Sequence, residues 1–383
     1  MVSLGETAMV TIEKVDTTDR AQIRRFIKIP FRLFERHPQW VPPIRSDVAL
    51  VLNRKKHPFY EHSTADFFIA VRDGKDIGRI AALENCNYNK YHDVRTAQFY
   101  LFDCEDDSEA GAALFQRVFE WARLRNLDTL VGPKGFSPFD GYGLLQEGFE
   151  HRQMMNMMNY NYPYYLRLVE EAGFEKEMDF VSHFVVPEDV RLPDRLYRIA
   201  ERAKRRHRLE VIRFNTKREL RRWTGKIGRA YNNAFVKNWE YVPLTEREIS
   251  FVVDTITLVA NPKLIKIIAQ DGNVVGFAFG WPDVSAAMQR CKGRLFPFGI
   301  FDLLLEMRRT SWISGNGVGI LPEFQGRGGN ALLYAEMERT VGEFGFKYHE
   351  MTQIAETAVQ MRKDLESLGG KAYKNHRVYR KPL

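Results

Sequence analysis

The sequence predicts a mixed α/β (α+β) fold that is built twice, once in each half of the chain. Each half contains a predicted β-hairpin, whose turn is Asp73-Gly74 in the first half and Asp271-Gly272 in the second. An Asp-Gly pair between two apolar runs is typical of a hairpin turn. In both halves the hairpin precedes a strand, a helix, a strand, a helix and a final strand. We therefore expect tandem domains, each a mixed, mostly antiparallel twisted sheet flanked by helices.

Length and composition indicate an ordinary globular protein with two domains. The chain has 383 residues, of which 44% are hydrophobic and 28% are charged. This length is long for one compact domain. Pro187 and Pro193, together with several charged residues, interrupt the pattern of elements between the halves. A boundary there predicts domains at 8–188 and 189–383.

No stretch of the sequence approaches the roughly 18 apolar residues of a membrane span, and acidic residues occur where a signal peptide needs an apolar core. The sequence therefore predicts a cytoplasmic protein without a membrane partner. Its three cysteines, Cys86, Cys104 and Cys291, are odd in number and widely spaced. This spacing favours reduced thiols over zinc sites or disulfides, and we expect no metal.

In the first half, apolar runs and helical spacing define the expected elements. A helix follows the acidic stretch that ends at Ser108, and Ser108 is its expected N-cap. Asn161 and Pro163 open a second expected helix, which ends at Gly173. The expected strands are 65–71, 77–83, 97–104, 127–131 and 180–186.

In the second half, the connection 281–311 between the hairpin and the next strand is far longer than a direct link requires, and it is strongly apolar. It either walls an acceptor pocket or packs between the two halves. The expected strands of this half are 209–214, 264–269, 274–280, 313–321, 348–354 and 373–380. The expected helices are 218–235, 245–259, 329–344 and 355–368.

The segment from Gln325 to Asn330 contains three glycines and leads directly into the helix 329–344. Glycines let the backbone approach a ligand closely, and the free N–H groups at a helix start attract anions. Arg327 adds positive charge, and no acidic residue lies between Gln325 and Ala335. The segment therefore predicts a site for a pyrophosphate group.

This loop resembles the signature of the GNAT superfamily of acyl-CoA N-acyltransferases, in which Gln or Arg, two residues, Gly, one residue, then Gly or Ala wrap the pyrophosphate of acyl-CoA. The last position departs from the signature, because Asn330 stands where Gly or Ala is usual. The resemblance implies acetyl-CoA or another acyl-CoA as co-substrate. The residues it assigns to that co-substrate are Val318, Gly319, Ile320, Gln325, Gly326, Arg327, Gly328, Gly329 and Asn330.

Passages in both halves also resemble an uncharacterised bacterial family with two GNAT-like halves. They include Gly132-Pro133, Gly148-Phe149, Asn238-Trp239 and Gly293-Arg294-Leu295-Phe296-Pro297. This resemblance supports the tandem organisation, and it implies no particular substrate.

The corresponding junction of the first half, 103–109, has five carboxylates and no glycine before Gly111. Those acids would satisfy the helix N-terminus themselves and repel a phosphate, each by about 4 kcal/mol at 4 Å under an effective dielectric near 20. We therefore expect no CoA in the first half, which would orient the second half or shape a substrate pocket.

Acyl transfer to an amine needs a neutral amine, a stabilised oxyanion and a proton for the leaving thiolate. By topology, Glu350 and Glu356 are the carboxylates expected to act as base, and Tyr373 and Tyr379 are candidate acids. Gly315, Gly317 and Gly319 alternate along the strand 313–321, which predicts a bare strand face for the pantetheine arm. In GNAT enzymes a bulge in this strand exposes an N–H to the thioester, and a helix tyrosine is common; the helix 355–368 has none.

The net charge of +8 is compatible with a phosphorylated co-substrate, and the basic segment 191–222 is typical of a solvated helix face, so nucleic acid is not the expected partner. The expected acceptor is a small-molecule amine or a peptide amine. Two alternatives stay open. One is a non-catalytic binding or regulatory module; the other is an acyltransferase whose donor, acyl carrier protein or aminoacyl-tRNA, docks on 191–222.

Overall fold

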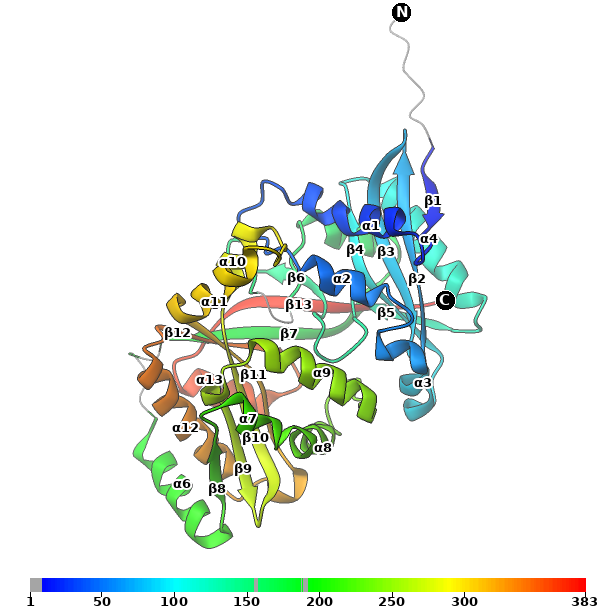
Figure 1. Ribbon diagram of the computed structural model, residues 1–383. Helices are drawn as coiled ribbons and strands as arrows, with labels where there is room; N and C mark the ends of the chain where they lie inside the picture. The colour runs from blue at the N-terminus through cyan, green and yellow to red at the C-terminus, as the bar shows by residue number, and fades with distance from the viewer. Residues whose placement is uncertain (1–8, 155–157, 187, 189–191) are drawn as a thin grey trace, which may run out of the picture. The chain divides into compact units, whose positions relative to one another are not determined.

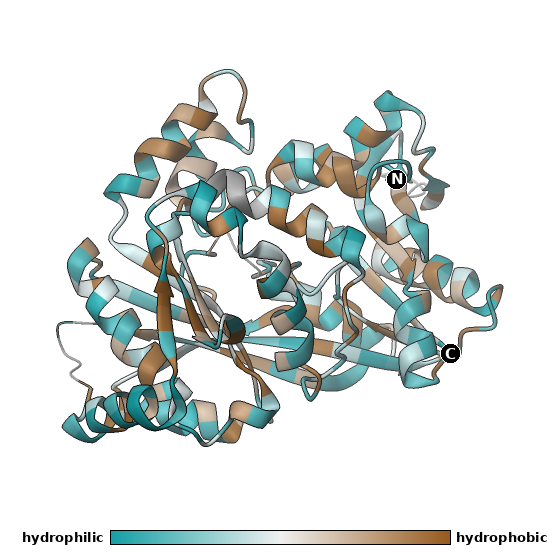
Figure 2. Ribbon diagram, turned by 60° about the horizontal axis from the view of Figure 1, so that its bottom comes forward, coloured by the Kyte–Doolittle hydropathy of each residue, from teal (hydrophilic) through white to brown (hydrophobic). Residues whose placement is uncertain are grey.

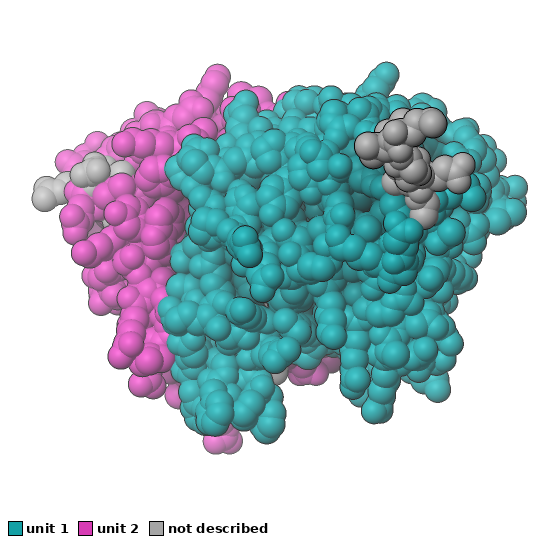
Figure 3. All heavy atoms as spheres, turned by 90° about the horizontal axis from the view of Figure 1, so that it is seen from above, with its two compact units in different colours: residues 1–180, 285–303, 374–383 teal, residues 181–284, 304–373 magenta. Residues whose placement is uncertain are grey.

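The computed structural model describes residues 9–154, 158–186, 188 and 192–383, and it divides into two compact units. The first unit comprises the chain up to residue 180 together with 285–303 and 374–383 (Figure 3). The second unit comprises 181–284 and 304–373. Each unit is therefore made of segments that are not continuous along the chain. The expected domains 8–188 and 189–383 are each continuous, and those domain limits stay a prediction.

In the first unit an antiparallel hairpin is extended on both sides (Figure 1). Strand β2 pairs with β1 and β3, β3 pairs with β4, and all these pairs are antiparallel. Strand β4 pairs with β5 in parallel. The elements are β1 (Thr11–Lys14), α1 (Arg20–Leu33), α2 (Arg45–Val51), β2 (Thr64–Arg72), β3 (Lys75–Glu84), α3 (Cys86–His92), β4 (Thr96–Cys104), α4 (Ser108–Arg123), β5 (Thr129–Gly132), β6 (Leu144–Glu147) and α5 (Tyr164–Glu171).

Helix α4 shows why this unit folds as the sequence indicates. Its apolar residues Ala110, Leu114 and Val118 recur at helical spacing, and all three are fully buried against the sheet. The N-cap is Asp107, whose carboxylate accepts a hydrogen bond from the Ala110 N–H at 3.0 Å. The expectation that Ser108 is the cap was therefore wrong by one residue, because the longer acidic side chain one position earlier reaches the same N–H.

In the second unit β8, β9, β10 and β11 form successive antiparallel pairs, and β12 pairs with β11 in parallel. Several strands are coloured as hydrophobic, and hydrophobic and hydrophilic residues alternate on the helices (Figure 2). The elements are α6 (Asp194–His207), β8 (Glu210–Arg213), α7 (Lys217–Arg221), α8 (Thr224–Ala234), α9 (Glu246–Val259), β9 (Ile265–Gln270), β10 (Asn273–Pro282), β11 (Trp312–Ile320), α12 (Gly329–Phe344), β12 (Tyr348–Ala355) and α13 (Val359–Ser367).

The two remaining strands and the long connection pass from one unit to the other along the chain. Strand β7 (Glu175–Val185) leaves the first unit, and β13 (Lys371–Pro382) returns to it. The connection 281–311 forms α10 (Ser285–Cys291) and α11 (Gly299–Arg309). Within the first unit α10 is held by Gln289, whose Nε2 donates to the carbonyl oxygens of Pro38 at 2.7 Å and Trp40 at 2.9 Å. The predicted mixed fold with hairpins in both halves is confirmed.

Candidate functional site

The glycine loop of the second unit presents an open helix N-terminus. Gly328 is the N-cap of α12 with φ of 83°, and no side chain caps this helix start. The first helical hydrogen bond runs from the Leu332 N–H to the Gly328 carbonyl at 3.2 Å. The N–H groups of Gly329, Asn330 and Ala331 therefore precede the helical ladder, which is the arrangement that binds phosphate oxygens.

The two positive-φ glycines of this loop differ in their surroundings. A Cβ on Gly328 would lie 2.9 Å from Cγ2 of Ile199 and 3.1 Å from Cβ of Ala203, both on α6. A Cβ on Gly326, where φ is 73°, would meet no atom within 4 Å. Gly328 is therefore fixed by close packing of α6, whereas Gly326 faces open space.

The remaining loop residues lie at the surface. Gln325, Arg327 and Asn330 are exposed, and the Arg327 guanidinium lies 5.1 Å from the centre of the Phe324 ring. The Gln325 side chain is held by a hydrogen bond from its Nε2 to the Ile320 carbonyl at 3.3 Å. The loop thus offers one cation and several amides to an anion.

Strand β11 approaches the loop through an irregularity. The register between β10 and β11 shifts between Ala278 and Gly280, opposite Gly317, whose φ is 85°. This is the β-bulge that the GNAT resemblance implied. Three of the residues that the resemblance assigns to the co-substrate precede the loop in β11. Of these, Val318 is half-buried, and Gly319 and Ile320 are buried.

The expected bare face of β11 is not present. A Cβ on Gly315 would lie 2.5 Å from His349 Nε2, and a Cβ on Gly319 would lie 2.6 Å from Cζ of Phe277. Likewise, a Cβ on Gly317 would lie 2.9 Å from Cδ2 of Phe279. The prediction was wrong because rings from the neighbouring strands fill the space that each glycine leaves.

Glu350 lies in β12 opposite Ser314 of β11 and is fully buried. Its Oε1 accepts a hydrogen bond from the hydroxyl of Tyr373, also in the second unit. The Tyr373 ring packs edge-on against Phe184 at 5.2 Å between centroids. A buried carboxylate beside a phenol is suited to accept and pass on a proton.

The other two predicted catalytic residues are placed differently. Glu356 is a half-buried residue of the turn that follows β12. Tyr379 belongs to the first unit, where it pairs with Gly132 of β5 and its hydroxyl accepts a hydrogen bond from Gln146 Nε2 at 2.9 Å. Burial raises the pKa of the Tyr379 hydroxyl. The structure therefore joins Glu350 to Tyr373 and places Tyr379 in the core of the other unit.

Sequence reasoning missed His349, the neighbour of Glu350 on β12. Its imidazole lies over Gly315, and its Nε2 is shielded from solvent and makes no hydrogen bond with the described residues. Burial lowers the pKa of His349 to about 4, so the ring is neutral at pH 7. The pair His349-Glu350 in an apolar strand was the available signal.

The five carboxylates of the first unit are engaged in local structure. Asp107 caps α4. Asp103 forms an ion pair with the buried Arg79, with 2.7 Å between its Oδ2 and Nε of Arg79. The others meet arginines as well: Glu105 pairs with Arg32, Asp106 with Arg167, and Glu109 with Arg72. The arginines offset the repulsion that the sequence suggested, while the Asp107 side chain fills the helix N-terminus. The absence of CoA from this unit stays a prediction.

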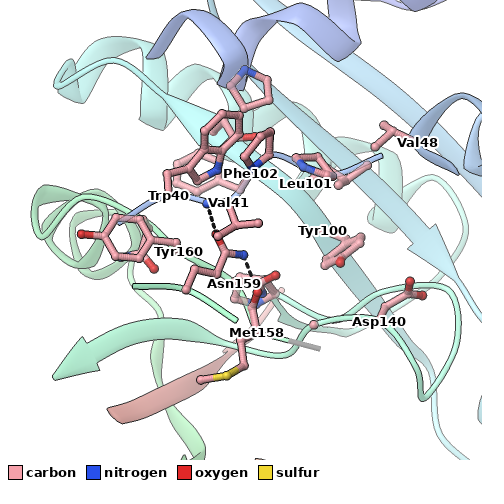
Figure 4. A pocket seen from close by; sticks show the side chains of 18 of the residues that line it. Trp40, Val41, Val48, Tyr100, Leu101, Phe102, Asp140, Met158, Asn159 and Tyr160 are labelled. Atoms are coloured by element: carbon pink, nitrogen blue, oxygen red, sulfur yellow. Dashed lines mark hydrogen bonds between the residues drawn. The ribbon is translucent and has the colours of Figure 1, made fainter. Parts of the chain in front are cut away.

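A pocket of about 340 Å³ lies within the first unit (Figure 4). Its walls come from the segment that follows α1, from β4 and from the loops after β5 and β6. Most of the lining is apolar, with Trp40, Val41, Phe102 and Met158 among it. No sequence pattern predicted it, because its walls come from segments far apart in the chain.

Three carboxylates, those of Asp47, Asp103 and Asp140, are among the polar groups of this pocket. Ser137 donates to Oδ2 of Asp140 from its N–H at 2.8 Å and from its hydroxyl at 3.2 Å. Burial raises the pKa of both Asp47 and Asp140, and neither forms an ion pair with a described residue. Arg79 also reaches the pocket, but Asp103 neutralises it. Asp47 and Asp140 are thus the carboxylates of this pocket that have no cationic partner among the described residues.

The described residues hold no group of three or more His, Cys, Asp and Glu side chains that could bind a metal ion. None of their helices combines the length and the apolar character that crossing a membrane requires.

Comparison with known proteins identifies the fold. No family model matches the chain. Bacterial ceramide synthase of Caulobacter vibrioides is 28% identical over 378 residues, which are 95% of this chain and 95% of that protein. Protein YghO of Escherichia coli is 26% identical over 393 residues, covering 99% and 98% of the two chains. A tandem GNAT protein from the clavulanic acid biosynthesis pathway superposes with a TM-score of 0.56 at 12% identity, over 97% of this chain and 98% of that one. The chain therefore has the fold of the GNAT superfamily, as its glycine loop indicated.

Proposed function

We propose that the second unit transfers an acyl group from acyl-CoA, acetyl-CoA being the simplest donor, to an amine. The buried hydrogen-bonded pair of Glu350 and Tyr373 carries this proposal, because the same unit also presents the open N-terminus of α12. The GNAT fold supports acyl transfer in general.

In the proposed reaction the pyrophosphate accepts hydrogen bonds from the loop amides near Gly328 and is attracted by Arg327. Glu350 takes a proton from the acceptor ammonium, and the free amine attacks the thioester carbonyl carbon. A backbone N–H at the β11 bulge stabilises the oxyanion. The C–N bond forms, the C–S bond breaks, and the departing thiolate takes a proton from Tyr373, which recovers one from the protonated Glu350. The nitrogen releases its second proton to water, which leaves the neutral amide.

The acceptor and acyl chain are proposed only as chemical classes. One relative is named a ceramide synthase, and a ceramide is an amide of a long-chain amino alcohol and a fatty acid. We therefore include long-chain acyl-CoA and long-chain amino alcohols beside acetyl-CoA and short amines.

Release of free thiol from these donors, measured with a panel of amines, tests the proposal. We expect amine-dependent thiol release by the wild-type protein and its loss in Glu350→Gln. CoA binding without thiol release for any donor and amine would favour the non-catalytic module. Activity only with acyl carrier protein or aminoacyl-tRNA would favour the other donors.

We also propose that the pocket of the first unit binds a small molecule with an apolar body and an ammonium group. The specific observation is the presence of Asp47 and Asp140, without ion pairs to described residues, in a pocket that also has apolar walls. A bound ammonium group would supply the positive charge with which these two carboxylates could form an ion pair. This would give the first unit a ligand of its own.

A further inference from the structure

The turn and helix from Lys292 to Arg309 expose a group of large apolar side chains. The exposed fraction is 89% for Phe296, 79% for Phe298 and 67% for Phe301. Leu304 and Leu305 continue the group at 48% and 42%. Scattered apolar residues are common on protein surfaces, but a cluster of neighbouring phenylalanines and leucines marks an interaction site.

The protein holds this segment in place while leaving its apolar face outside. Gly299 and Leu303 are the buried residues of α11, whereas Phe301, Leu304 and Leu305 follow one another at helical spacing on an exposed face. Helix α11 is also linked to α10 by an ion pair, with 2.8 Å between Nη2 of Arg290 and Oδ1 of Asp302.

The turn before α11 is tightly packed. A Cβ on Gly299 would lie only 2.1 Å from the Arg294 carbonyl oxygen. The Ile300 N–H also donates to the Leu295 carbonyl at 2.7 Å, which closes the turn that carries Phe296 and Phe298. The two rings are therefore presented by an ordered turn.

Cations flank the apolar residues on both sides. Lys292 and Arg294 precede them, Arg308 and Arg309 follow them, and all four side chains are exposed. The acids of the segment are Asp302, which is paired with Arg290, and Glu306. An apolar centre with a basic border fits the interface of an anionic bilayer, where rings enter the boundary of headgroups and acyl chains and cations meet phosphates.

We propose that the segment 292–309 binds the surface of an anionic lipid bilayer. Phe296, Phe298 and Phe301 enter the interface, and the flanking Lys and Arg residues contact the headgroups. This mode needs no spanning helix, so the lack of an apolar stretch of that length does not bear on it. The proposal is independent of the acyl transfer proposed above.

Sedimentation of the full-length protein with vesicles tests this proposal. One set of vesicles contains phosphatidylcholine alone, and the other contains phosphatidylcholine with about 30% phosphatidylglycerol, which supplies the anionic headgroups. We expect the wild type to sediment with the anionic vesicles and to be released by 0.5 M NaCl, because headgroup contacts are screened by salt. Failure to sediment with the anionic vesicles at low salt would overturn the proposal.

Two variants divide the apolar part from the electrostatic part. Phe298→Ser with Phe301→Ser should lower the partition coefficient at least about tenfold, since it removes two interfacial rings. Arg308→Gln with Arg309→Gln should reduce the preference for anionic vesicles by about tenfold or more. Leu124→Ser is the matched control, because Leu124, the C-cap residue that follows α4, is 78% exposed and lies outside the segment.

A second readout reports the depth of the segment directly. Phe296→Trp should shift its tryptophan emission to shorter wavelength when anionic vesicles are added, beyond the change seen in the wild type. Unchanged emission, or equal vesicle binding by the double Phe variant with an unaltered melting curve, would contradict the proposal. A variant that instead converts a dimer into a monomer in sedimentation equilibrium would assign the face to a second copy of the chain, and would also overturn it.

Discussion

Tyr373 donates a hydrogen bond from its hydroxyl to Oε1 of Glu350, which lies on a different strand and is fully buried. This contact fixes the orientation of the Glu350 carboxylate, and Glu350 is paired with Ser314 of the neighbouring strand β11. It also places an O–H proton on the same carboxylate that would receive a proton from an amine. The acid–base chemistry proposed for the second unit depends on this pair.

Replacing Glu350 by Gln should lower kcat by about 10²- to 10⁴-fold, because it removes the proposed general base while keeping the shape of the side chain. Steady-state thiol release with saturating acyl-CoA measures the effect. The apparent KM for the donor should stay within about twofold, since the glycine loop is untouched. Glu356→Gln serves as the control; an equal loss of kcat in that variant would argue against Glu350 as the specific base.

Replacing Arg327 by Glu should weaken CoA binding by at least about tenfold, because the exposed guanidinium becomes a carboxylate next to the phosphate site. Titration calorimetry with CoA gives the affinity, and the melting temperature without CoA should not change. Arg222→Glu makes the same change in net charge at another exposed position of the second unit. If both variants bind CoA equally, the loop does not hold the pyrophosphate.

Alanine at the two loop glycines should affect stability unequally. Gly328→Ala should cost about 2–3 kcal/mol, because its Cβ would collide with Ile199 on α6 in addition to straining a positive φ. Gly326→Ala meets no neighbour and should cost about 1 kcal/mol, from backbone strain alone. Urea denaturation of the CoA-free proteins measures both values, and equal losses would mean that α6 does not pack on the loop as described.

The stability of the protein should fall as the pH is lowered from about 6.5 towards 4, in part through His349. Its folded pKa is about 4 against 6.5 for a free histidine, so in this range the unfolded chain binds a proton that the folded chain does not. One such proton contributes at most about 1.4 kcal/mol per pH unit. His349→Gln should flatten the dependence of the urea midpoint on pH, and an unchanged slope would show that the ring titrates normally.

For the pocket of the first unit, 2-phenylethylamine should raise the melting temperature and 3-phenylpropionate, a carboxylate of similar size, should not. Asp140→Asn should remove this difference, because the ammonium loses a charged partner. Affinity for the amine should increase with pH through the raised pKa of Asp140, since only the ionised carboxylate attracts a cation. Asp93→Asn, at an exposed position, should bind the amine as the wild type does; equal stabilisation by the two compounds would refute a cation site.

Features encoded by neighbouring residues could be predicted from the sequence. The hairpin turns and the helix from Gly329 to Phe344 follow local patterns, and the structure has them at the expected places. Gly315 and Gly319 show where local reasoning failed. Their spacing was visible, but the rings that cover them come from β12 and β10, whose register the sequence did not reveal.

The position of Tyr379 illustrates a second limit. The final strand was expected, yet nothing in its own residues shows that its last part pairs with β5 of the first unit. The same holds for the pocket, whose walls meet only after β4, β5 and the segment following α1 have packed. Contacts between distant segments decide both cases.

The use of residues 374–383 by the first unit affects how the protein is made. Tyr379, Arg380 and Lys381 pair with Gly132, Val131 and Leu130 of β5, which the ribosome produces long before them. During translation, the edge of β5 that pairs with β13 therefore stays unpaired until residues 374–383 have been made. Unpaired strand edges favour aggregation. A fragment ending near residue 188 would keep that edge permanently, so the two halves should be expressed together.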